Sequence, residues 1–134
     1  MVERGLLAAA AVAVAVFTVL WLHSSRLETQ AQAIAERPPQ ALSVRDINRA
    51  AHLFESARAH NPDSRPTERE AGLLIRSGRS RKALALLKPV VKREPQDLTA
   101  WALIAAGAST IDPALAREAV ARARALNPLG ARAR

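Results

Sequence analysis

The stretch of sequence that decides the fold is TEREAGLLIRSGRSRKALALLKPVVKREP, residues 67–95. Its first part has Thr67 and Glu70 at the spacing of a capping box, which marks the start of a helix. Gly78 stands where a left-handed residue ends such a helix, and a second run with helical periodicity then leads to Pro95. The stretch therefore predicts two helices joined by a short turn.

The same unit recurs along the chain with a period of 33 residues, and its end is marked by Asn61-Pro62, Glu94-Pro95 and Asn127-Pro128. Alignment at that offset places small and bulky residues in columns that form one face of a helix. The columns are Ala50, Ala83 and Ala116; Leu53, Leu86 and Ala119; Phe54, Leu87 and Val120; and Ala57, Val90 and Ala123. Because small residues let two helices approach closely, the pattern predicts an array of helical hairpins.

Capping residues mark the helix boundaries within this array. We predict helices over residues 44–60, 67–76 and 97–108. Asp97 is the expected N-cap of the last of these. Asp112-Pro113 places a capping carboxylate before a proline at the first helical position, so a final helix should begin there.

The helix–turn–helix unit resembles the tetratricopeptide repeat over roughly residues 43–128, and the type that it resembles is the membrane-anchored bacterial one. The matching positions are Ala71, Leu74, Gly78, Ala83, Leu87 and Pro95 in the middle unit and Trp101, Ile104, Ala105, Ala116, Val120, Ala123 and Pro128 in the third. The resemblance implies an all-α solenoid of about two and a half repeats. The first unit is expected to keep only its second helix, because Pro38-Pro39 fall where its first helix should be. Pro89 is expected to bend the second helix of the middle unit.

The resemblance also implies a function in binding. The first helices of such repeats line a concave groove that receives a peptide or helix of another protein, here one associated with a membrane. Carried over by position, the groove residues are Arg65, Glu68, Ile75, Arg76, Thr99, Ala102 and Ser109, with Gly72 and Ala106 beside them. Glu68 and Gly72 do not supply the Lys and Asn that hold a terminal carboxylate in the chaperone-tail binders, so that subclass is not expected.

The amino-terminal run GLLAAAAVAVAVFTVLWL, residues 5–22, contains no charge and only one polar side chain. As a helix it is roughly 27 Å long, close to the ~30 Å hydrocarbon core of a bilayer. The preferred prediction is a single-pass membrane anchor. A cleaved secretory signal is the main alternative, because Ala31-Gln32-Ala33 has the form that signal peptidase accepts, and a buried core helix is the third. The flanking Arg4 and Arg26 leave the side of the membrane undecided.

The chain is accordingly divided into four parts. Residues 1–26 are the predicted anchor, and residues 27–42 are a helical stalk with the Pro-Pro joint. The repeat domain spans 43–128, and a basic tail spans 129–134. So few units are near the minimum for a stacked array, which favours self-association or docking on a larger membrane protein. A stable small monomer is the equal alternative on size alone.

Composition limits the other classes of function. The absence of cysteine excludes disulfide scaffolds and thiolate sites, and 3% aromatic residues argue against a nucleic acid held by base stacking. His52 and His60 have no carboxylate at metal-ligand spacing, and no phosphate-binding loop or paired carboxylates can be identified. We therefore expect no enzyme, no metal and no cofactor.

The positive charge suggests an alternative function. The formal net charge is +8, and basic residues cluster in 76–82 and 117–124. Such clusters are usually solvated helix surface, but they also suit an anionic partner. The alternative prediction is thus a basic, membrane-tethered domain that binds an anionic polymer or a lipid surface.

Overall fold

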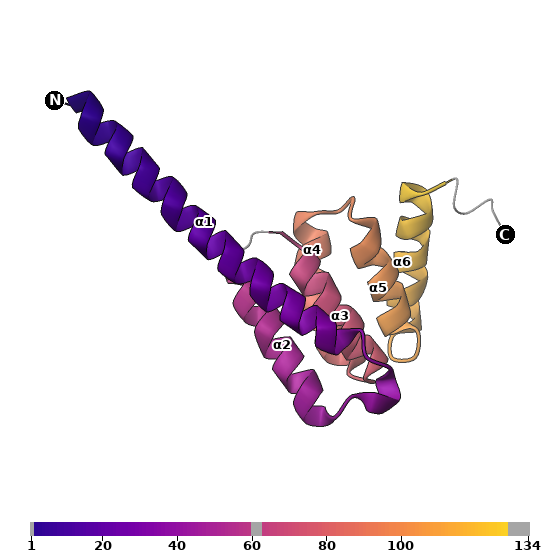
Figure 1. Ribbon diagram of the computed structural model, residues 1–134. Helices are drawn as coiled ribbons and strands as arrows, with labels where there is room; N and C mark the ends of the chain where they lie inside the picture. The colour runs from indigo at the N-terminus through magenta and orange to yellow at the C-terminus, as the bar shows by residue number, and fades with distance from the viewer. Residues whose placement is uncertain (1, 60–62, 129–134) are drawn as a thin grey trace.

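The computed structural model describes residues 2–59 and 63–128, and every regular element in this part of the chain is helical (Figure 1). The helices are α1 (Val2–Ala35), α2 (Val44–Arg58), α3 (Arg65–Arg76), α4 (Ser80–Arg93), α5 (Leu98–Ala108) and α6 (Pro113–Leu126), with a short 3-10 turn at Pro39–Ala41. The predicted all-α class is confirmed. His60, the Asn61-Pro62 marker and the basic tail 129–134 lie outside the described residues.

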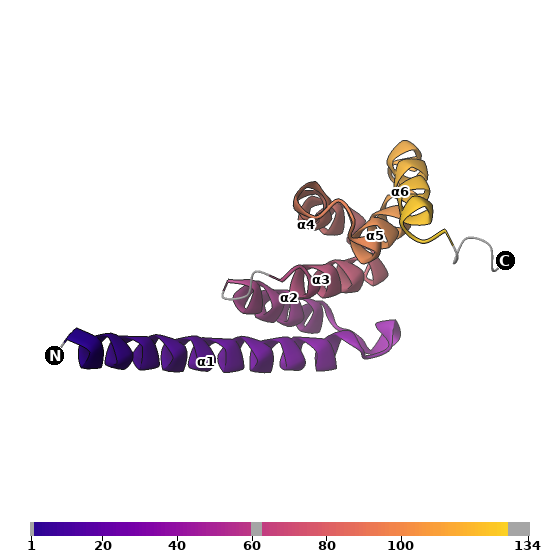
Figure 2. The same cartoon turned by 90° about the horizontal axis from the view of Figure 1, so that it is seen from above.

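The helices pair in sequence order into three hairpins. The second half of α1 packs against α2, α3 packs against α4, and α5 packs against α6. In addition, α1 contacts α3 and α3 contacts α5, so the first helices of the hairpins form one continuous layer. Figure 2 shows α1 as a straight rod along one side of the molecule, with the later hairpins turned progressively away from it.

The second half of α1 supplies the first helix that the first repeat was expected to lack. Ala31 and Ile34 are buried, and the Ser24 hydroxyl donates a hydrogen bond of 2.8 Å to the Ala57 carbonyl near the end of α2. That expectation was wrong because a strict 33-residue offset places the helix too near α2. The prolines at 38–39 end α1 and lengthen the connection to α2, and the helix lies upstream of them.

Most of the predicted caps are present. The Asp97 carboxylate accepts a hydrogen bond of 2.9 Å from the Ala100 amide, and Asp112 accepts one of 3.0 Å from Leu115. Gly78 has a φ of +75°, as expected of a left-handed residue after a helix. These caps set the starts of α5 and α6 and the end of α3 where the sequence placed them.

The predicted capping box at Thr67 and Glu70 is wrong. α3 begins two residues earlier, at Arg65, with Ser64 as its N-cap and Pro66 in the first turn. Thr67 and Glu70 are buried inside the helix instead. The reciprocal box occurs at α2, which the sequence analysis missed: Ser43 Oγ accepts from the Asp46 amide, and the Asp46 carboxylate accepts from the Ser43 amide.

The repeat columns hold in the first two hairpins and fail in the third. In the first two hairpins the buried column members are Ala50, Phe54, Ala57, Ala83, Leu87 and Val90. Their counterpart Val120 on α6 is 38% exposed, and on that helix only Ala119 is buried. The reason is that α3 and α5 cover α2 and α4, whereas no described helix follows α6 to cover it. Pro89 lies exposed inside α4, which runs from Ser80 to Arg93, so the bend predicted there stays a prediction.

The first half of α1 extends beyond the hairpins (Figure 1). From Ala10 to Leu22 its apolar side chains, among them Val14, Phe17 and Trp21, are exposed. Among the described residues, one helix is long and apolar enough to cross a membrane, and it covers Ala10–Ala35. Length and composition alone make this segment a candidate membrane span or signal sequence.

Candidate partner groove

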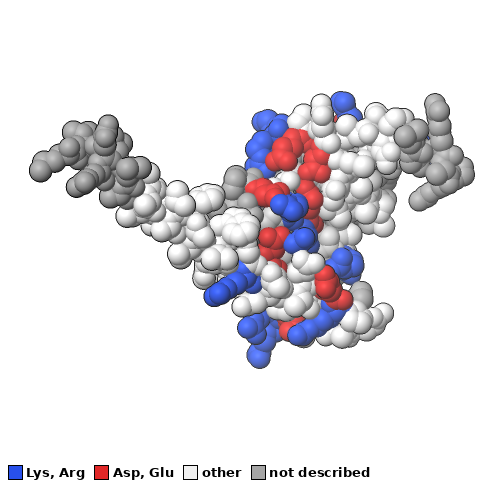
Figure 3. All heavy atoms as spheres, turned by 45° about the horizontal axis from the view of Figure 1, so that its top comes forward, with Lys and Arg blue, Asp and Glu red and all other residues white. Residues whose placement is uncertain are grey.

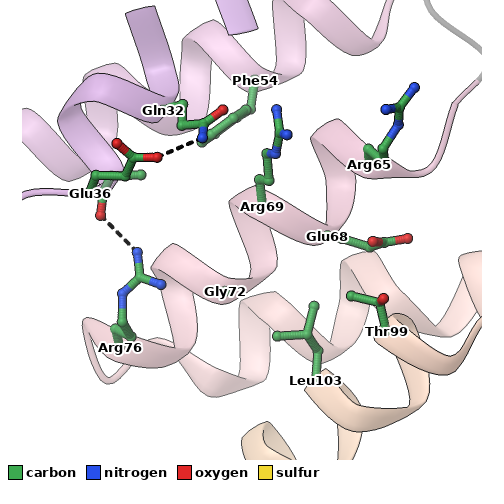
Figure 4. Close-up of a pocket in the computed structure, with 11 residues that line it drawn as sticks. Gln32, Glu36, Phe54, Arg65, Glu68, Arg69, Gly72, Arg76, Thr99 and Leu103 are labelled. Carbon is green, nitrogen blue, oxygen red and sulfur yellow. Dashed lines mark hydrogen bonds between the residues drawn. The ribbon is translucent and has the colours of Figure 1, made fainter. Parts of the chain in front are cut away.

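The layer of first helices contains a groove of about 480 Å³. Figure 4 shows α3 along its middle, with α1 on one side and α5 on the other. Its lining residues are Gln32 and Ala35 from α1, Glu36 directly after α1, Phe54 from α2, Arg65, Glu68, Arg69, Gly72 and Arg76 from α3, and Thr99 and Leu103 from α5. The groove therefore depends on α1 for one wall.

Arginines of α3 hold that wall in place. Arg76 donates a hydrogen bond of 2.7 Å to the Ala35 carbonyl, which belongs to the last turn of α1 (Figure 4). Arg69 forms an ion pair with Glu28, which lies about two turns before Ala35 on α1. Charge at these positions thus joins α1 to α3, and the arginine at 76 satisfies a carbonyl that the helix end leaves without an internal partner.

Glu68 is a buried acid of the groove, and its pKa is raised. Its residue is 9% exposed, and its carboxyl group lies in hydrogen-bond contact with the Asp97 side chain. Burial, followed by the hydrogen bond with Asp97, raises the pKa of Glu68 to about 7, while a hydrogen bond with Ser64 acts in the opposite direction. Near neutral pH this carboxyl group therefore carries a proton part of the time, and it links α3 to the N-cap of α5.

A second buried acid lies outside the groove. The Glu70 carboxylate is 2.8 Å from the Arg58 guanidinium, with side-chain exposures of 9% and 30%. Burial raises the pKa of Glu70, and the charge of Arg58 opposes that rise. The pair joins α2 to α3, so its role is to hold two hairpins together.

The candidate groove residues are divided among different places. Arg65, Glu68, Arg76 and Thr99 line the groove. Ile75 and Ser109 line a second hollow near the turns that follow α3 and α5, as does Ala106. Ala102 is exposed on α5 and lines neither of these two hollows.

Sequence reasoning missed the groove residues at and just beyond the end of α1. Gln32 and Glu36 lie in the segment assigned to a stalk, and they are joined by a hydrogen bond of 2.6 Å. Arg69 and Leu103 were also missed. Helical spacing was the available signal, since Gln32 and Glu36 are one turn apart, as are Thr99 and Leu103.

Charges of both signs line the groove side of the molecule. Figure 3 shows acidic and basic side chains interleaved in the middle of this view, beside an arm whose described outer part is white. The ion pairs Arg69–Glu28 and Arg65–Asp63 belong to this region, and the second has an N–O distance of 2.6 Å. Among the described residues, no group of three or more His, Cys, Asp or Glu side chains is arranged to hold a metal ion.

Stacked antiparallel hairpins whose first helices line one groove define a helical-repeat protein. A family model described as "Tetratricopeptide repeat" matches residues 41–107, which is half of the 134-residue chain. The chain belongs to the tetratricopeptide repeat family. No curated protein and no solved structure matches it. Domains of this family are typically modules of protein–protein interaction without catalysis.

Proposed function

We propose that this protein is a single-pass, membrane-anchored adaptor whose groove binds a peptide or helix of another membrane-associated protein. The anchor is the apolar run 5–22 within residues 1–26, and the side on which the hairpins lie is not assigned. The observation that carries the proposal is the continuity of α1, which contains the apolar run and also one wall of the groove.

The packing of α1 supports an anchor over a cleaved signal. Cleavage after Ala33 would remove Ser24 and Ala31, both of which are buried against the repeat domain. It would also remove Gln32 from the groove and Glu28 from its pair with Arg69. A signal peptide has no reason to carry half of a folded hairpin.

The same continuity supports a position of the groove near the bilayer. Gln32 follows Leu22 by ten residues of unbroken helix, which is about 15 Å along the axis. The hydrocarbon edge would fall near Leu22, and the headgroup layer extends several Å beyond it. A segment bound in the groove would thus lie just outside the headgroups, where juxtamembrane segments of other membrane proteins are found.

Site-specific photocrosslinking in native membranes tests this proposal. A photoreactive residue at Gln32, which lines the groove, should give a discrete crosslinked protein band. The matched control is Gln30, which is exposed on the same helix two residues away and lines no described hollow. The band from position 32 should disappear when Gly72→Leu fills the groove floor.

The contrary outcomes are equally specific. Equal labelling from positions 30 and 32, or labelling of lipid alone, would exclude the groove as the binding site. The salt response separates the alternative function, a basic tether for an anionic polymer or lipid. A charge-driven complex weakens steeply between about 50 and 200 mM salt, whereas a groove contact that buries apolar surface changes little.

A further inference from the structure

The basic segment RSGRSRK, residues 76–82, borders a second hollow that the proposed groove does not include. This basic hollow has a volume of about 960 Å³. It is lined by Asn48, Ile75, Gly78, Arg79, Ser80, Arg81, Lys82, Ala106, Ser109, Thr110 and Ile111. It therefore lies where the turn between α3 and α4 meets the turn between α5 and α6.

The charge of the basic hollow is of one sign. Arg79, Arg81 and Lys82 are among its lining residues, and no Asp or Glu is. Arg79 donates a hydrogen bond of 2.7 Å to the Asn48 side-chain oxygen, which holds its guanidinium at the rim. Some arginines elsewhere on the described surface pair with carboxylates, as Arg65 does with Asp63 and Arg93 with Glu94. The basic hollow is thus suited to a ligand that brings its own negative charge.

The floor of the hollow is partly apolar. Ile75 is half-buried, and Ile111 is 42% exposed in the turn before α6. The hydroxyl of Ser109 is used within the chain, since it donates to the Ala106 carbonyl at 2.8 Å. A ligand that fits this surface therefore combines anionic groups with an apolar side chain.

The position of the hollow argues against lipid headgroups as its ligand. α1 meets the far end of α2, where Ser24 bonds the Ala57 carbonyl, whereas Arg79 bonds Asn48 nine residues earlier on α2. That separation is about 14 Å along α2, directed away from the apolar arm. No aromatic side chain lines the hollow, so it offers no surface on which nucleic-acid bases could stack.

We propose that the basic hollow binds an acidic segment of a protein partner, with carboxylates against Arg79, Arg81 and Lys82 and an apolar side chain against Ile75 and Ile111. This inference deepens the proposed function, because it rests on a protein partner and names the chemistry of its segment. A partner would contact both places if its acidic segment continued from the part held in the groove.

The test is fluorescence anisotropy of the full-length protein in non-ionic detergent. The probe is a labelled 12-residue peptide of glutamates with two central leucines, and a single-stranded DNA oligonucleotide serves as a second polyanion. The test variant is the double substitution Arg81→Glu and Lys82→Glu. Acidic residues in the first turn favour a helix, so this variant should keep α4 folded. Circular dichroism checks that point.

The matched control is Lys88→Glu with Lys92→Glu. It makes the same change in net charge on the same helix, at exposed positions outside the hollow. We expect the test variant to weaken peptide binding at least tenfold at 50 mM salt and the control to weaken it less than threefold. We also expect the peptide to bind more tightly than the oligonucleotide.

Three results would overturn the proposal. They are no peptide binding by the wild-type chain, equal loss in the two double variants, and tighter binding of the oligonucleotide. The second would mean that only net charge matters, and the third would indicate a nucleic-acid surface. Because the assay needs neither a membrane nor the groove, its failure is distinguishable from failure of the proposed adaptor function.

Discussion

At the scale of single residues, Glu68 makes the stability of the fold depend on pH. Its pKa is raised to about 7 by burial and by Asp97, against 4.5 for an ordinary glutamate. The folded state therefore holds the proton more tightly than the unfolded chain does. Between pH 4.5 and 7 the folded state binds more protons, so the free energy of unfolding falls as the pH rises through this window.

Replacement of Glu68 by Gln should remove this pH dependence. From pH 5 to pH 8 we expect the wild-type chain to lose about 1 kcal/mol more stability than Glu68→Gln, since one pKa unit corresponds to about 1.4 kcal/mol and the open groove reduces the full effect. Urea unfolding in detergent at both pH values measures the difference. Glu118→Gln, at an exposed position on α6, is the control and should behave like wild type. Parallel curves for all three chains would contradict the prediction.

Two helical glycines should respond differently to alanine. A Cβ at Gly72 would be in ordinary contact, 3.8 Å from Leu103. A Cβ at Gly107 would lie 3.3 Å from two atoms of Ile75, which is tighter than normal. We expect Gly72→Ala to stabilise the fold by about 0.5–1 kcal/mol through reduced backbone entropy, and Gly107→Ala to lose that gain. Urea midpoints compare them, and equal stabilisation would show that Ile75 moves aside freely.

At the scale of elements, α1 combines an exposed apolar segment and a packed segment in one helix. Residues 10–22 form an exposed apolar arm, and the second half of α1 is the first helix of the first hairpin. A helix of 34 residues is about 51 Å long, enough for a membrane span followed by three turns in the repeat domain. The apolar arm and the packed segment therefore belong to one unbroken helix.

A pair of substitutions on α1 tests its packing against α2. Ala31 is fully buried, while Ala33, two residues along, is exposed. Ala31→Glu should cost about 3–5 kcal/mol, because it places an unpaired charge in the core, and Ala33→Glu should change stability by less than about 0.5 kcal/mol. The measurement is urea unfolding, with amide exchange of α2 as a local probe. Equal and small effects would mean that α1 does not belong to the hairpin.

At the scale of the whole molecule, the anchor itself is open to test. The full-length chain should remain in the membrane pellet after extraction with alkaline carbonate. Val14→Arg with Val16→Arg should release it, because each arginine near the bilayer centre costs about 3 kcal/mol or more. The control is Thr29→Arg with Gln30→Arg, at exposed positions beyond the apolar run, and it should stay in the pellet.

The mass of the mature chain distinguishes the remaining alternative. An anchor predicts a polypeptide that keeps its apolar run. A chain that begins after Ala33 would instead identify a signal peptide and would contradict the anchored adaptor. Such a chain should also be unstable, because it lacks the buried Ser24 and Ala31.

The sequence by itself determined the class of fold and most of its boundaries. Its information was local: Gly78 needs a positive φ, Asp97 and Asp112 cap helices within three residues of themselves, and the 33-residue period reports helix faces. Each of these signals depends on neighbours along the chain or on one helical face. These local signals could therefore be interpreted without knowing which helices pack together.

Only the tertiary structure decided which helix α1 packs against and where the candidate site residues lie. Whether Ala31 is buried depends on α2, which follows the proline pair, and no local signal reports a packing partner across a connection of variable length. In the same way, Ile75 and Ser109 were predicted to line the groove but line the basic hollow instead. The rotation between successive hairpins decides which neighbours each side chain of a helix contacts. Sequence periodicity identifies the buried face of a helix, whereas the rotation between hairpins decides which residues that face contacts.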